Sequence, residues 1–113
     1  MSYCRAIRSG SFIAVSGTTS IKDGKVFAPN DVGAQTRRCF EIINDSLEKL
    51  GATMSHVVRT RMFVTDISQW ETIGKIHAEY FKAIPPATSI YEVKSLIDSE
   101  LIIEIEVDAI AAL

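Results

Sequence analysis

Apolar side chains recur every three or four positions after Asn30-Asp31, which is the spacing of an amphipathic helix. A short side-chain acceptor at Asn30-Asp31 can cap the start of this helix, and Gly51 supplies the left-handed residue that commonly ends one. The predicted buried stripe is Thr36, Phe40, Ile43, Leu47 and Leu50. The charge pairs expected on its wet side, four residues apart, are Arg37 with Glu41 and Asp45 with Lys49.

A second helix is predicted between Ser68 and Pro85-Pro86. Ser68 and Glu71 have the spacing of a capping box, and the proline pair stops the helix. Gly74 inside this segment costs roughly 1 kcal/mol relative to alanine, which predicts a close neighbour at that position. The predicted apolar stripe is Trp70, Ile73, His77, Tyr80 and Ile84.

Runs of β-branched and aromatic residues predict strands. Residues 3–17 contain two such runs around Ser9-Gly10, which predicts a hairpin, and residues 57–64, 87–93 and 101–111 predict three more strands. Residues 57–64 divide into Val58, Thr60, Met62 and Val64 on one face and Arg59, Arg61 and Phe63 on the other. The last strand divides into Ile103, Ile105, Val107 and Ala109 against Glu104, Glu106 and Asp108.

The order of these elements predicts an α+β fold, in which a mixed β-sheet has both helices packed on one face. The other face would then combine apolar residues with two arginines and several carboxylates. Such a face suits an oligomer interface in which the charges pair, since an unpaired buried ion costs several kcal/mol. We expect Arg61 to pair with Glu106, which would leave Glu104 free to act on a water molecule.

The composition limits the domain organisation and the partners. A chain of 113 residues is expected to form one domain (1–113), and 47 % apolar residues again favours a subunit interface. The net charge is −2 and no basic run exceeds Arg37-Arg38, which argues against DNA or RNA as a partner. The sequence has neither a signal-peptide pattern nor a membrane span, so we expect a cytoplasmic protein. Cys4 and Cys39 lack CxxC spacing and are expected to be reduced thiols.

Few residues point to chemistry by spacing alone. His77 lies on an apolar stripe and is expected to pack, while His56 lies at a loop-strand junction with nothing to orient it. Clustered metal ligands are missing, so no metal site is expected. Glu104 and Glu106 project to the same side of one strand, where ion pairing with arginine and activation of a water molecule are both open.

Four segments carry a resemblance that runs along the whole chain in order. They are VSG at 15–17, RTRMFVTDISQW at 59–70, PPATSIYEV at 85–93 and IEIEVDAIA at 103–111. These segments resemble the YjgF/RidA family, also known as L-PSP endoribonuclease or translation initiation inhibitor-like proteins. The resemblance implies a chorismate-mutase-like subunit in a homotrimer, with sheets around a central barrel and clefts between subunits. It also implies hydrolysis of reactive enamines or imines to 2-keto acids and ammonia without a cofactor.

The same resemblance assigns four candidate residues of a cleft that binds a small molecule. The cleft tyrosine of the family falls on Tyr3, and its loop serine and glycine fall on Ser16 and Gly17. Its water-directing glutamate falls on Glu104, which is therefore the candidate catalytic residue.

The resemblance fails at the residue that clamps the substrate carboxylate. Thr88 stands where the family has an arginine, and Ile90 stands where it has a cysteine. An arginine fork gives a carboxylate two charge-assisted bonds, whereas a hydroxyl gives one neutral bond, so we expect weak binding of the family's usual anion. Arg61 is a further candidate for the cleft, where it would partly replace the missing clamp.

Three functions are compatible with these residues. The first is an imine or enamine deaminase with a different substrate. The second is a trimer that binds a metabolite or a partner without catalysis, which Thr88 favours. The third is an endoribonuclease or translation inhibitor, as in the family's other name, and the acidic charge balance argues against it.

Overall fold

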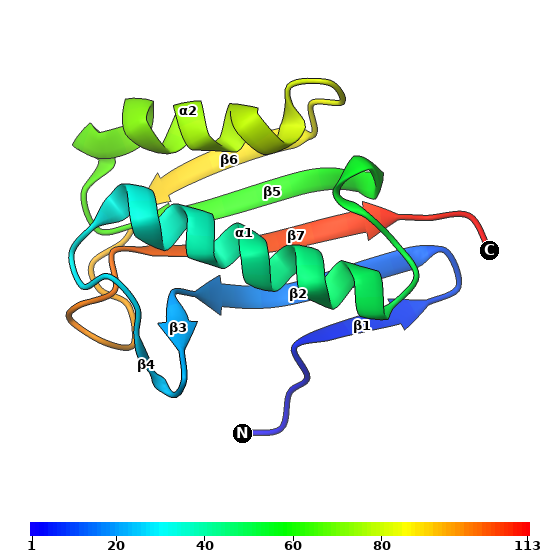
Figure 1. Ribbon diagram of the computed structural model, residues 1–113, viewed down its shortest axis with the longest axis horizontal. Helices are drawn as coiled ribbons and strands as arrows, with labels where there is room; N and C mark the ends of the chain where they lie inside the picture. The colour runs from blue at the N-terminus through cyan, green and yellow to red at the C-terminus, as the bar shows by residue number, and fades with distance from the viewer.

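Five strands form one mixed sheet in the computed structural model, which describes residues 1–113, and both helices cover the same face of that sheet (Figure 1). The strand order is β1-β2-β7-β5-β6, in which β5 and β6 are parallel and the other neighbours antiparallel. The strands are β1 (Ala6–Ser9), β2 (Phe12–Thr19), β5 (Val57–Val64), β6 (Ala87–Glu92) and β7 (Ile103–Ile110). The predicted α+β class is therefore confirmed.

Two hairpins shape the N-terminal part of the chain. Gly10 lies in the turn between β1 and β2 with a φ of 60°, in the left-handed region that glycine adopts without strain, so the predicted hairpin is confirmed. A smaller hairpin of β3 (Ile21–Lys22) and β4 (Lys25–Val26) lies outside the main sheet. Asp23 and Gly24 at its tip both have positive φ, which fits the primed turn of a two-residue hairpin.

Helix α1 (Val32–Lys49) begins and ends as the sequence predicts. The Asp31 carboxylate accepts a hydrogen bond from the Ala34 N–H at 3.1 Å, and Gly51 follows the helix with a φ of 79°. The predicted stripe is buried at Thr36, Phe40, Ile43 and Leu47 and half-buried at Leu50. No helix of the protein combines the length and the apolar character needed to cross a bilayer.

One of the two predicted charge pairs on α1 forms. Lys49 lies 3.1 Å from Asp45, as expected. The prediction that Arg37 pairs with Glu41 is wrong, because α2 (Trp70–Phe81) packs beside α1 and brings Glu79 to Arg37. The guanidinium donates to both oxygens of Glu79, a forked geometry that is stronger than a single contact.

The start of α2 differs from its prediction. The capping box of Ser68 and Glu71 does not form. The Ser68 N–H and hydroxyl both donate to the Asp66 carboxylate, at 3.0 and 2.6 Å, and cap a 3₁₀ turn (Ile67–Gln69) that precedes the helix. A local side-chain bond thus fixes the chain one turn earlier than expected.

The apolar stripe of α2 is also shorter than predicted. Trp70 is 55 % exposed and Ile84 54 % exposed, because the first is the first residue of the helix and the second lies beyond its end at Phe81. Ile73, Ile76 and Phe81 are buried against the sheet. The prediction of a close neighbour at Gly74 is wrong within the chain, since a Cβ there would meet nothing within 4 Å.

A β-bulge in β5 overturns one face assignment. Val57 pairs with Ala109 and Arg59 with Asp108, so two steps along β5 match one step along β7 and Val58 is left unpaired. Val57 is therefore buried and Val58 is 43 % exposed. Beyond the bulge, the alternation of β5 and β7 holds as predicted, and Thr60, Met62, Val64, Ile103, Ile105, Val107 and Ala109 are buried under the helices.

Candidate functional site

Four predicted site residues line one pocket beside strands β2 and β7. Ser16 and Gly17 lie on β2, Glu104 lies on the neighbouring strand β7, and Tyr3 precedes β1. The pocket has a volume of about 470 Å³. It is also lined by Met1, Arg5, Thr19 and Ile97. The structure thus brings together the candidate catalytic carboxylate and three of its predicted neighbours.

A bulge in β2 contains two of the pocket residues, Ser16 and Gly17. The pairing of β2 with β7 shifts between Val15 and Thr18, so Ser16 and Gly17 have no direct partner on β7. The side chain of Glu104 lies over Gly17, where a Cβ would come within 2.6 Å of Oε2 of the glutamate. Gly17 is therefore needed because the carboxylate of Glu104 occupies the space of its missing side chain.

The carboxylates of β7 have different partners. Arg61 donates from Nη1 to Glu106 and to Asp108, each at 3.2 Å, so the predicted Arg61–Glu106 pair is confirmed and extends to a third residue. The side chain of Glu104 has no hydrogen bond or ion pair within the chain and lines the pocket. Because Arg61 does not line this pocket, its expected contact with a ligand stays a prediction.

The N-terminal segment is fastened to the bulge by three hydrogen bonds. The Ser16 hydroxyl donates to the Cys4 carbonyl at 2.7 Å, and the Ser16 N–H donates to the Arg5 carbonyl at 3.0 Å. The Arg5 guanidinium donates from Nη2 to the Gly17 carbonyl at 2.8 Å. The hydroxyl of Ser16 therefore anchors the segment and keeps only its lone pairs for a ligand. Sequence reasoning missed Arg5, whose only signal was its place two residues after Tyr3.

Thr88 and Ile90 do not join this pocket within one chain. Both lie on β6, which β7 and β5 separate from β2. Ile90 packs against the core beneath the helices. The Thr88 hydroxyl is 2.9 Å from the Thr60 hydroxyl and 3.1 Å from the Pro86 carbonyl, so it is already engaged in the chain's own hydrogen bonds.

The two histidines are both held by their surroundings. His77 Nε2 lies 3.0 Å from the Thr60 hydroxyl, its ring packs against Phe40 and Phe81, and burial lowers its pKa. The packed role predicted for His77 is confirmed. The expectation that nothing orients His56 is wrong, because its Nδ1 accepts from the Thr53 N–H at 3.0 Å in a short capping motif.

Both cysteines are free thiols, as the sequence predicts. Cys4 is exposed, and Cys39 is buried with its sulfur 3.3 Å from the Thr18 carbonyl. Burial, with a further contribution from the Glu104 charge, raises the pKa of Cys39 to about 12. Cys39 therefore behaves as an apolar core residue.

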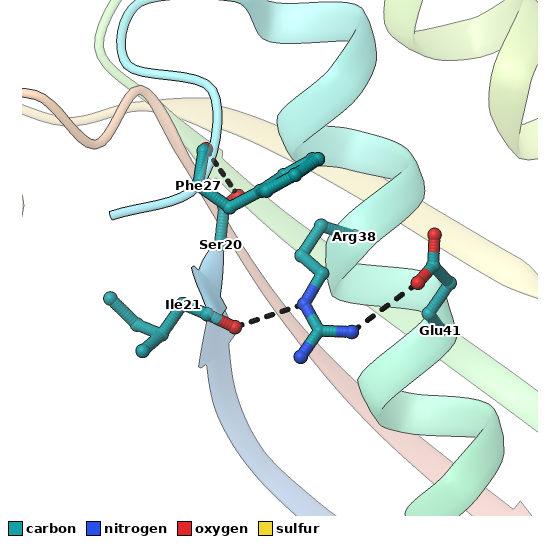
Figure 2. A network of polar contacts seen from close by, with 5 residues as sticks. All are labelled: Ser20, Ile21, Phe27, Arg38 and Glu41. Atoms are coloured by element: carbon teal, nitrogen blue, oxygen red, sulfur yellow. Dashed lines mark hydrogen bonds and ion pairs between the residues drawn. The ribbon is translucent and has the colours of Figure 1, made fainter. Parts of the chain in front are cut away.

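A second pocket of about 720 Å³ shares Tyr3, Arg5 and Thr19 with the first. Figure 2 shows its wall, where Arg38 of α1 donates to the Ile21 carbonyl at 2.9 Å and to Glu41 at 3.3 Å. The β3-β4 hairpin is held beside it by the Ser20 hydroxyl, which donates to the Phe27 carbonyl at 2.8 Å. The Arg38 charge is thus compensated within the wall.

Comparisons with known proteins give a consistent result. A family model described as Endoribonuclease L-PSP matches residues 1–112. Reactive Intermediate Deaminase A, chloroplastic, of Arabidopsis thaliana is 33 % identical over 113 residues, which cover 98 % of this chain and 58 % of that protein. The crystal structure of Rv2704 from Mycobacterium tuberculosis, a member of the YjgF/YER057c/UK114 family, is 45 % identical with a TM-score of 0.87 and covers 96 % of this chain and 86 % of its own. YyfA of the Rid family, from Yersinia pestis, is 34 % identical with a TM-score of 0.91 and covers 96 % and 87 %.

Proposed function

The chain belongs to the Endoribonuclease L-PSP family, which is the YjgF/RidA family, and from this membership we propose that it hydrolyses a reactive imine or enamine in the Glu104 pocket. The family resemblance seen in the sequence is thereby confirmed, and the chain is a RidA-like protein. The substrate and the chemical step are our proposal. One observation carries it: Glu104 is a carboxylate without a partner in the chain, beside a glycine that leaves it room.

The proposed step uses Glu104 as a general base and then as a general acid. A water molecule attacks the carbon of the C=N bond while its proton passes to the Glu104 carboxylate. The protonated glutamate then returns this proton to the nitrogen, which gives a carbinolamine. Glu104 next takes the proton of the new hydroxyl and passes it to the nitrogen, and the C–N bond breaks as the C=O bond forms, which releases ammonia and a carbonyl product. An enamine would first tautomerise to the imine, since its β-carbon takes a proton from water and its nitrogen loses one to water. The balance requires no oxidant, reductant or cofactor.

The other residues of the pocket would orient the ligand. Tyr3 offers a hydroxyl and an aromatic face, and the lone pairs of the Ser16 hydroxyl can accept a hydrogen bond. The backbone N–H of Gly17 would donate to the ligand. In a homotrimer of the kind that the family resemblance implies, Thr88 and Ile90 of a neighbouring copy would close the cleft.

Replacing the carboxylate tests this function. We expect Glu104→Gln to slow the hydrolysis of imines generated in situ from amino acids by about 100-fold or more, which is the scale of general acid–base catalysis. Glu106→Gln is the matched control, because it makes the same change two residues along the same face but in the Arg61 pair. Equal rates for wild type and Glu104→Gln would refute the proposal.

A second candidate is a metabolite-binding protein without turnover. Thr88 in place of an arginine favours it, because the chain then lacks the family's carboxylate clamp at that position. Wild type that binds 2-keto acids but leaves every tested imine unchanged would support this candidate over the enzyme.

A further inference from the structure

Arg5 lines the same pocket as Glu104, and we propose that its guanidinium binds the carboxylate of the ligand there. The proposal rests on the function proposed above and adds the residue that recognises the anion. The ligand class is then a small carboxylic acid whose reacting carbon lies within reach of Glu104. The chain would thus replace the absent clamp at Thr88 with an arginine from its N-terminal segment.

Arg5 is held by Gly17, and the side chain of Glu104 lies over the same glycine. The Arg5 Nη2 donates to the Gly17 carbonyl at 2.8 Å, and the Arg5 carbonyl accepts from the Ser16 N–H at 3.0 Å. Glu104 packs over the same Gly17. The Arg5 guanidinium and the Glu104 carboxylate therefore line one pocket next to the same glycine, and they do not form an ion pair with each other.

Arg5 is the arginine with donors to spare near Glu104. Only one of its five N–H groups is engaged by the chain, and no carboxylate pairs with it. Arg59 pairs with Asp108, and Asp108 lies four residues, or about 13 Å, along β7 from Glu104. The remaining arginines are held elsewhere: Arg8 by the carbonyls of Gly10, Leu50 and Ala111, Arg37 by Glu79, Arg38 by Ile21 and Glu41, and Arg61 by Glu106 and Asp108.

The two charges suit a ligand with an anion at one end and an electrophilic carbon at the other. The Arg5 Nη2 has one N–H on each fork of the guanidinium, and Gly17 engages one of them, so the other fork keeps two donors for parallel bonds to a carboxylate. Both charges also act on buried Cys39, because Glu104 raises the pKa of this thiol and Arg5 lowers it. A carboxylate on Arg5 would leave the adjacent carbon of the ligand facing Glu104.

Binding of a stable 2-keto acid tests the assignment without any turnover. The probe is 2-oxobutyrate, compared with its neutral amide, 2-oxobutanamide, in NMR titrations of the full chain. We expect Arg5→Gln to weaken 2-oxobutyrate by roughly 10- to 100-fold, the value of hydrogen bonds to a charged group, and to leave the amide unchanged. Arg37→Gln makes the same charge change in the Glu79 pair and should bind like wild type. Arg5→Lys should fall between wild type and Arg5→Gln.

Two results would overturn the assignment: equal 2-oxobutyrate affinity in wild type and Arg5→Gln, or equal losses in Arg5→Gln and Arg37→Gln. Should Arg5→Gln not fold, the Nε–H resonance of Arg5 in wild type must shift with 2-oxobutyrate and not with the amide, and no shift refutes the proposal. Because binding is read directly, a wild type that binds through Arg5 but hydrolyses no imine would contradict only the proposed function.

Discussion

Gly17 and Glu104 contact each other from neighbouring strands, and the contact depends on the missing side chain of the glycine. The Oε2 atom of Glu104 lies 2.6 Å from where a Cβ of residue 17 would be. The atom that would have to move is the end of a flexible side chain, so the backbone of the bulge can stay in place. Function should therefore be more sensitive than stability to a substitution at Gly17.

We expect Gly17→Ala to lower imine hydrolysis by about 10-fold or more, because the added methyl displaces the carboxylate from its position. The melting temperature should change little. Gly33→Ala is the matched control, since its Cβ would meet Ile76 at an ordinary 3.6 Å and lies on α1 away from the pocket. Unchanged activity in Gly17→Ala would show that the carboxylate acts from another position.

At the scale of elements, α2 is joined to β5 and β6 by a chain of hydrogen bonds. The Pro86 carbonyl can only accept, so the Thr88 hydroxyl donates to it and accepts from Thr60. Thr60 then accepts from the Nε2–H of His77. A neutral imidazole with its proton on Nε2 satisfies every member of this chain.

The titration of His77 couples this packing to pH. Burial lowers its pKa below the ordinary value of 6.5, so the unfolded chain takes up the proton at a higher pH than the folded chain does. The contribution of neutral His77 to the free energy of unfolding is therefore complete above about pH 6.5, and it is lost as the pH drops toward the lowered pKa of the folded state.

We expect wild type to lose more unfolding free energy than His77→Gln between about pH 7.5 and pH 5.5. Glutamine keeps an N–H donor for Thr60 and removes the titration, so the two proteins should differ in pH dependence more than in fold. Urea unfolding at both pH values measures the difference. Parallel losses in the two proteins would show that another group carries the acid sensitivity.

At the scale of the whole molecule, the sheet face away from the helices is only partly covered. We call it the outer face; its apolar members are Ile7, Phe12, Phe63, Tyr91 and Ile110. Phe63 and Tyr91 stack on neighbouring strands with ring centroids 5.8 Å apart. The Arg61 cluster with Glu106 and Asp108 lies on the same face with its charges already paired. A face of this composition is suited to burial against other copies.

We expect the protein to be a homotrimer with three times the 12.5 kDa mass of the chain. Light scattering at micromolar concentration measures this mass. Tyr91→Glu should weaken the trimer, because it places a charge on the outer face, whereas Trp70→Glu on the helix layer should leave it intact. A wild-type monomer would refute this assembly and leave the cleft without Thr88 and Ile90 of a second copy.

The sequence by itself determined the elements, the class of the fold and the family. Periodicity located both helices and the strands, and alternation on β7 separated the core residues from Glu104, Glu106 and Asp108. These predictions succeeded because they depend on residues three or four apart in the helices, or two apart in the strands, whose geometry the backbone fixes locally. The site residues Tyr3, Ser16, Gly17 and Glu104 followed from matching motifs, and they do share one pocket.

Only the tertiary structure decided what distant segments do to one another. The bulge that exposes Val58 and the pairing of Arg37 with Glu79 both depend on a neighbouring element whose register no local pattern specifies. The same holds for Arg5, which reaches the pocket because it bonds to Gly17 twelve residues away. Thr88 was recognised as a substitution, but its engagement with Thr60 required β5 and β6 to be adjacent. Side chains acquire such partners through packing, which follows from the arrangement of whole elements and not from their own sequence.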